Sequence, residues 1–124
     1  MDSAMTIAAS GLAAAITSLA TAASNVANAQ TSGTPESVYQ SATVIETPRA
    51  DGGVTATIIR APNTSFSFNP AAPFANAQGM VAVPNLDVAA QMVNQITASL
   101  AFQANAKVFQ IAARNQKSLI DLIA

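Results

Sequence analysis

The chain has 124 residues, of which 51% are hydrophobic, 5% aromatic and only 9% charged. Ordinary soluble domains carry about 25% charged residues, so much of this surface is expected to be covered by other protein or by lipid. A net charge of −1, with five scattered cations, excludes a basic surface of the kind that binds nucleic acid. Without cysteine or histidine, disulfides are absent and a zinc site has almost no candidate ligands. The length suits one small domain, with or without long helical arms.

The first segment, about residues 4–29, is predicted to form a long helix without a single charged residue. A glycine followed by a proline in residues 31–35 ends it. Isolated helices of this composition are marginal in water, so packing against a partner must stabilise it. Its larger apolar residues recur at heptad-like spacing, which is typical of packed helices and not of strands. They are Leu12, Ile16, Leu19 and Val26.

An alternative for this segment is a membrane-spanning or cleaved N-terminal sequence, which would make the chain a small membrane-associated or secreted protein. About 20 uncharged residues are long enough to cross a bilayer. However, no Lys or Arg flanks the segment, and its faces are rich in Ala, Ser and Thr. A signal peptide would also need a basic region at its start, which is missing here.

The middle of the chain is predicted to be a small β region. Its stretches of β-branched or alternating residues are separated by Gly- and Pro-containing turns. Asp51-Gly52-Gly53 has the chemistry of a hairpin turn between the first two strands. In the third strand, alternation places both phenylalanines on one side. The predicted strands are 38–47, 54–60, 65–68 and 80–83.

The last segment, residues 86–123, is predicted to be a second helix of about 55 Å. Asn85 is expected to cap its start, and Asp87 to lie in the first turn, where the helix dipole favours a negative charge. A helix this long usually has a partner along it. Its apolar residues follow three- and four-residue steps, and include Val93, Ile96, Leu100, Val108 and Ile111.

These elements together predict a mainly α protein with a small β region. The long terminal helices are expected to pack as a coiled-coil-like pair, with a small β-hairpin domain between them. The expected division is an N-terminal helix in residues 1–32, β strands and loops in 33–84, and a C-terminal helix in 85–124.

No catalytic constellation is found in the sequence. General acid–base catalysis needs histidine or paired carboxylates, and the six acidic residues are spread over the chain. No serine has a histidine to activate it, and Asp51-Gly52-Gly53 lacks the lysine of a phosphate-binding loop. A ligand-binding module built on the β region would need convergent polar groups, which the sequence does not provide. We therefore expect no enzyme activity, no cofactor, no metal and no small-molecule substrate.

Two groups of polar residues on the helices have two interpretations each. Asn25 and Asn28 either cap the end of the first helix locally or fix the register between packed helices, as a buried asparagine does in coiled coils. In the second helix, Phe102, Gln103 and Asn105 are either a solvated surface or part of a contact.

The segment 23–31 (ASNVANAQT) resembles the N-terminal signature of flagellar rod and hook proteins. Residues 84–110 resemble their C-terminal signature, which runs through a Met-Val pair (Met92 and Val93) to an aromatic-Gln-Ala-Asn core beginning at Phe102. The family usually has an acidic residue before the Met-Val pair, where this chain has Gln91. Landmarks between the two signatures are similar to those of a proximal rod subunit. The chain is thereby identified as a member of the flagellar basal-body rod family.

This resemblance implies a structural subunit of the rod, located in the periplasm at the flagellar basal body and serving as part of the drive shaft for motility. Such subunits are exported unfolded through the flagellar type III apparatus and polymerise with copies of themselves and with other rod subunits. Their terminal helices gain stability on assembly, so the free monomer is expected to be partly disordered at its ends. The expected assembly interface consists of Leu12, Ile16, Leu19, Asn25, Val26, Asn28, Met92, Val93, Ile96, Leu100, Phe102, Gln103, Asn105, Val108 and Ile111.

Overall fold

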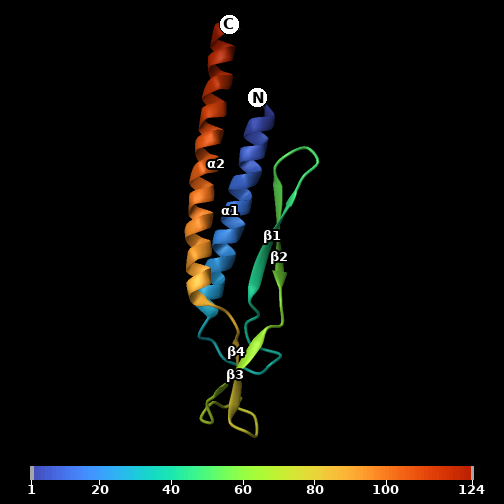
Figure 1. The fold of residues 1–124 in the computed structure, drawn as a ribbon, viewed down its shortest axis with the longest axis vertical. Helices are drawn as coiled ribbons and strands as arrows, with labels where there is room; N and C mark the ends of the chain where they lie inside the picture. The colour runs from blue at the N-terminus through green and yellow to red at the C-terminus, as the bar shows by residue number, and fades with distance from the viewer. Residues whose placement is uncertain (1, 124) are drawn as a thin grey trace.

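A computed structural model describes residues 2–123 and shows two long helices beside two β-hairpins (Figure 1). Helix α1 spans Asp2–Asn28 and helix α2 spans Val88–Ile123. The helices run antiparallel, with both chain termini at the same end of the molecule (Figure 1). The expected mainly α fold with a small β region between its terminal helices is confirmed.

The register between the helices is fixed by two contacts. Gly11 lies against Asn105, and Asn25 donates a hydrogen bond to Gln91. The same number of residues separates Gly11 from Asn25 on α1 as separates Gln91 from Asn105 on α2, so the register is constant along the contact. Because α2 is the longer helix, its last two turns continue beyond the start of α1 (Figure 1).

Small residues fill the contact between the helices. On α1 the buried apolar side chains are Ala8, Ala14, Ala15 and Ala22, and on α2 they are Ala98 and Ala112. Leu19, from the heptad-like row, is instead 38% exposed. Small side chains let two helix axes approach closely, which is how the pair packs without large residues between its members.

The start of α2 differs from the prediction. The Asp87 carboxylate accepts hydrogen bonds from the backbone N–H groups of Ala89 (2.9 Å) and Ala90 (3.2 Å), so Asp87 is the N-cap and does not lie in the first turn. Asn85, which was predicted to cap the helix, uses its side chain to donate to Asn63 instead, at 3.1 Å. Asn85 and Asp87 are both good capping residues. Asn63, in the loop before β3, bonds the Asn85 side chain, and Asp87 caps the helix.

Strands β1 (Ala42–Pro48) and β2 (Val54–Arg60) form the first antiparallel hairpin. Gly52 and Gly53 have φ of 87° and 85°, which explains the Gly-Gly pair in the turn. The predicted strand at 38–47 started too early. Residues 34–38 form a turn in which the Val38 N–H bonds the Thr34 carbonyl at 2.9 Å, and the strand begins only at Ala42.

Strands β3 (Thr64–Phe68) and β4 (Met80–Pro84) form a separate antiparallel hairpin at the end of the molecule far from the termini (Figure 1). Phe66 and Phe68 lie on the same side of β3, as expected, but both are exposed. The hairpin is joined to the chain after α1 by a bridge between Gly33 and Ala82, with 3.0 Å bonds in both directions.

Candidate assembly surface

The apolar residues of this chain are distributed by size. Buried apolar side chains are mostly alanines, and Val38 and Val81 are the largest of them among residues 3–123. The large aliphatic and aromatic side chains of both helices lie largely outside. Large exposed apolar patches mark interaction sites in soluble proteins, because a lone monomer gains nothing from them.

Helix α2 carries large apolar side chains on several sides that do not contact α1. The apolar row consists of Val93, Ile96, Leu100, Val108 and Ile111, all exposed, with Leu100 at 61%. A second flank, closer to α1, carries the exposed side chains of Phe102, Phe109 and Ile120. Ile96 and Leu100 lie on the side opposite α1, and the polar row continues their line toward the C-terminus by three- and four-residue steps: Gln103, Lys107, Gln110, Arg114, Lys117 and Asp121.

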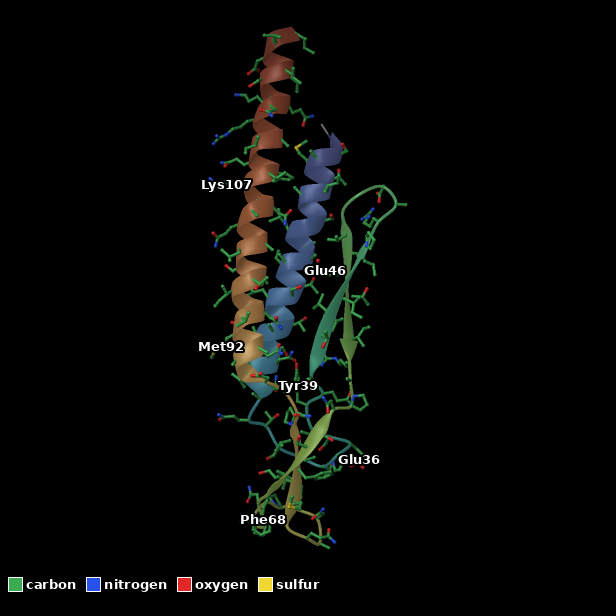
Figure 2. All side chains as sticks on the ribbon, in the orientation of Figure 1. Glu36, Tyr39, Glu46, Phe68, Met92 and Lys107 are labelled. Carbon is green, nitrogen blue, oxygen red and sulfur yellow. The ribbon has the colours of Figure 1, made fainter. Side chains whose placement is uncertain are left out.

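Figure 2 shows Lys107 of the polar row directed away from α1. From Gln103 onward the helix therefore presents water-compatible groups on that side. In the first half of α2 the same side is apolar, through Ile96 and Leu100, so apolar surface is exposed on more than one side of the helix.

Helix α1 also has large apolar side chains that are accessible in the single chain. Ile16 is exposed, Leu19 is 38% exposed at the edge of the face that carries Ala15 and Ala22, and Leu12 and Val26 are half-buried. Met92 near the start of α2 is also exposed, and Figure 2 shows it on the side of α2 away from α1. The large side chains expected in the assembly interface are thus all at least partly accessible in the single chain.

The Asn25 side chain is buried, with 1% exposure, and its polar atoms all bond within the chain. Its Nδ2 donates to the Ala42 carbonyl (2.8 Å) and to Gln91 Oε1 (2.9 Å). Its Oδ1 accepts from the Ala42 N–H and from the Tyr39 hydroxyl, both at 3.0 Å. Asn25 therefore ties α1, α2 and β1 together, which is the register-fixing role, here within one chain. We call these residues the Asn25 cluster.

The other polar candidates are arranged more locally. Asn28 and Asn105 each donate to the backbone carbonyl four residues earlier, at 2.9 Å, as in ordinary helix surfaces. Asn105 also lies against Gly11, so its side chain is part of the helix contact. Gln103 is exposed and points along α2 toward Ser99, at 3.5 Å.

A groove of about 620 Å³ runs between the two helices and the β1–β2 hairpin. The hairpin is held over α1 at its two ends. At its base the Asn25 cluster holds Ala42, and at its turn the Val54 N–H donates to Ser10 Oγ at 3.1 Å. The Ser10 hydroxyl in turn donates to the Ile7 carbonyl at 2.7 Å. Between these two contacts the groove separates the hairpin from the helix pair.

Electrostatics contribute little to this surface. Within residues 2–123 the only ion pair joins Arg49 and Asp51 in the hairpin turn, at 2.8 Å, and both side chains are exposed. The hydrogen bond and charge of Arg49 lower the pKa of Asp51, and the same contact raises the pKa of Arg49. The described residues contain no cluster of His, Cys, Asp or Glu that could hold a metal ion.

Residues 3–28 are apolar and long enough to cross a membrane, judged by length and composition alone. In the structure, however, α1 uses one face against α2 and another against the hairpin, where Ser10, Asn25 and Ser24 make specific hydrogen bonds. A core helix of a folded protein meets the same length criterion.

The sequence did not reveal the alanine contact or the groove. Ala8, Ala15 and Ala22 alternate with Leu12, Leu19 and Val26 by four and three residues, so the two rows share one face of α1. The sequence did not tell that the alanines of this face are buried while the larger residues stay partly exposed at its edge.

Comparison with known proteins gives consistent matches. A family model described as the C-terminal region of the flagellar basal body rod FlgEFG proteins matches residues 77–122. The chain is 40% identical over 111 residues to the flagellar basal-body rod protein FlgC of Salmonella typhimurium, covering 82% of both chains. FlgC of Yersinia enterocolitica is 39% identical over 110 residues, and FlgC of Escherichia coli O157:H7 is 39% identical over 111, each with 82% coverage of both chains. The similarity thus extends well beyond the C-terminal region.

Proposed function

Because this chain belongs to the family of flagellar basal-body rod proteins, we propose that it joins the rod through the exposed apolar faces of its terminal helices. The chain is a FlgC-like structural subunit of the flagellar basal-body rod and not an enzyme. Its partners are other rod components. The resemblance to flagellar rod proteins is confirmed by these relatives.

The observation that carries the proposed interface is the exposure of large apolar side chains on both helices. Full burial of one Leu, Ile or Val contributes about 1.5–3 kcal/mol. Leu100 alone exposes 61% of its side chain in the single chain, and its neighbours in the apolar row are similar. A few such residues covered by neighbouring subunits supply enough free energy to hold a subunit in place, after the loss of translational freedom is offset.

The finer features are proposals that follow from this arrangement. The helical segments 1–32 and 85–124 carry the contacts, and the β region 33–84 sets their spacing. The subunit polymerises with copies of itself in the periplasm after export through the flagellar type III apparatus. The small alanine core supports this route, because a chain with little buried apolar area costs little to unfold before export.

The membrane-associated alternative is not favoured. A membrane-spanning or cleaved α1 would not need the α1–α2 contact or the hydrogen bonds of the Asn25 cluster. The relatives, which the chain matches over 82% of their length, are rod proteins.

Replacing Leu19 by Asp tests the proposed interface in cells that lack their own copy of the gene. We expect the variant to be made and exported at normal levels but not to restore swimming, because a charge on this face cannot be covered by a neighbour. Leu19→Met, which keeps the size and polarity, is the matched control and is expected to swim. Normal swimming of the Leu19→Asp strain would refute the role of this face.

A further inference from the structure

The groove between α1, α2 and the β1–β2 hairpin is elongated along the helices. Its floor is the contact between α1 and α2, formed by small side chains such as Ala14, Ser18 and Ala98. One wall is the β1–β2 hairpin, through Val44 and Glu46. Residues 7–22 of α1 line it, so it is about 24 Å long, the length of roughly four helical turns. Its volume of about 620 Å³ accepts the side chains on one face of such a helix and not its whole cross-section.

The C-terminal end of α2 extends beyond the part of the helix that packs on α1. The contacts between Gly11 and Asn105 and between Asn25 and Gln91 place the start of α1 opposite Arg114. From Lys117 onward α2 therefore lies beyond α1, and Leu122 is 83% exposed. Ile111, Asn115, Ser118 and Leu122 follow one another by four, three and four residues, so they share one face. That face does not point toward α1, and it stays free along the roughly 20 Å from Ile111 to Ile123.

The two surfaces complement each other in size and charge. The groove has a floor of small residues, and the α2 end carries the large apolar side chains that such a floor can accept at close distance. Glu46 is the only charged side chain among the described groove residues. On the α2 end, Arg114 lies beside the apolar face, while Lys117 and the acid Asp121 lie farther around the helix.

The geometry points to the C-terminal end of α2 from a second copy of this chain as the occupant of the groove. This inference rests on the proposed function and names the contact by which one copy joins the next. In it, Ile111 and Leu122 of one copy pack on Ala14 and Ala98 of the other, and Arg114 pairs with Glu46.

Such a contact joins two different surfaces, so it is head-to-tail. Each copy keeps one free groove and one free α2 end after joining a neighbour. A heterologous contact of this kind builds an open helical array unless a rotation closes it into a ring. The Glu46 pair would be weak by itself, so its part is to orient the incoming helix.

Disulfide trapping tests the contact directly, because the chain contains no cysteine. Two full-length single-cysteine variants, Ser18→Cys in the groove and Ser118→Cys on the α2 end, are mixed and mildly oxidised, with one ¹⁵N-labelled. Mixed dimers are counted by mass. Ala20→Cys, exposed on another side of α1, replaces Ser18→Cys as the matched control. Thr97→Cys, on the α2 side of the groove, provides a second independent groove position.

We expect the mixed dimer to form several-fold more with Ser18→Cys or Thr97→Cys than with Ala20→Cys. Adding Glu46→Lys to the groove copy should lower the yield, and Arg114→Glu in the other copy should restore it. Equal yields for groove and control positions would overturn the inference. If that happens while the cysteine strains swim and Leu19→Asp does not, the inference fails and the proposed function stands.

Discussion

Gly11 of α1 lies so close to Asn105 of α2 that a Cβ atom added at Gly11 would be 2.6 Å from Asn105 Oδ1. Because Gly11 has no side chain, the two helices can approach each other closely at this point. Along the rest of the contact, alanines allow the same close approach. Because small residues occupy the inside of the pair, the large apolar residues remain outside and available to other subunits.

Gly11→Val is expected to lower the free energy of unfolding of the purified chain by about 1–3 kcal/mol, as overpacking does in a close contact. The valine side chain must displace Asn105, which bonds the Ala101 carbonyl at 2.9 Å. Urea unfolding followed by circular dichroism measures the change. Ala9→Val, at an exposed position of α1, is the control and should change stability by no more than about 0.5 kcal/mol.

Adding Asn105→Ala to Gly11→Val should recover part of the loss, because it removes the atoms with which the valine collides. A double variant as unstable as the sum of both single changes would show that the two residues do not compete for the same space.

Asn25→Leu is expected to destabilise the chain by about 3 kcal/mol, since it leaves the buried Ala42 N–H and Gln91 without their partner. Asn28→Leu provides the comparison, because Asn28 bonds only the Ser24 carbonyl within its own helix. Thermal unfolding of the two variants should differ clearly. Similar melting temperatures would mean that the Asn25 cluster does not hold α1, α2 and β1 together.

The elements of this fold were largely predictable from the sequence, and the packing was not. Periodicity predicted both helices and the turn glycines predicted the first hairpin, because these depend on local spacing. The row of Leu12, Leu19 and Val26 was detected as well. An assembling helix is apolar on more than one side, however, and spacing alone does not distinguish the face that packs in the chain from the face that meets a neighbour.

Asn25 illustrates how a site residue is placed by tertiary contacts. Its sequence context allowed a local cap or a register-fixing bond, and the choice depends on Gln91 and on the backbone of Ala42, far away in the sequence. The Asn85 cap failed for the same kind of reason, because Asn63 engages its side chain. Single-sequence patterns contain no information about such distant partners.

Hydrogen exchange of the monomer should vary along the helix pair. Amides near Asn25 and Gln91 are expected to exchange on the order of 100-fold more slowly than those of residues 117–123, which have no α1 beside them. The rest of α1 should fall between these values, because the residues buried there are small: alanines and Thr21. Mass spectrometry after proteolysis measures the gradient. Strong protection in residues 117–123 of the monomer would contradict the free α2 end.

Asp51 is expected to titrate below its ordinary pKa of 3.8, chiefly because Arg49 donates a hydrogen bond to its carboxylate. A lowered folded-state pKa means that the pair stabilises the hairpin turn above the unfolded pKa. That contribution is lost as the pH falls through the folded pKa. NMR of the carboxyl carbon measures the titration. In Arg49→Gln the value should return toward 3.8, and an unchanged value would exclude Arg49 as the cause.

The most direct test of the outer faces is swimming by cells that carry Leu100→Asp as their only copy. Leu100 is exposed, so the variant monomer should be as stable as the wild type to within about 0.5 kcal/mol. The same cells should nevertheless fail to swim, while Gln110→Asp, on the polar row of the same helix, should swim. Normal swimming with Leu100→Asp would contradict the claim that the apolar faces of the helices assemble the rod.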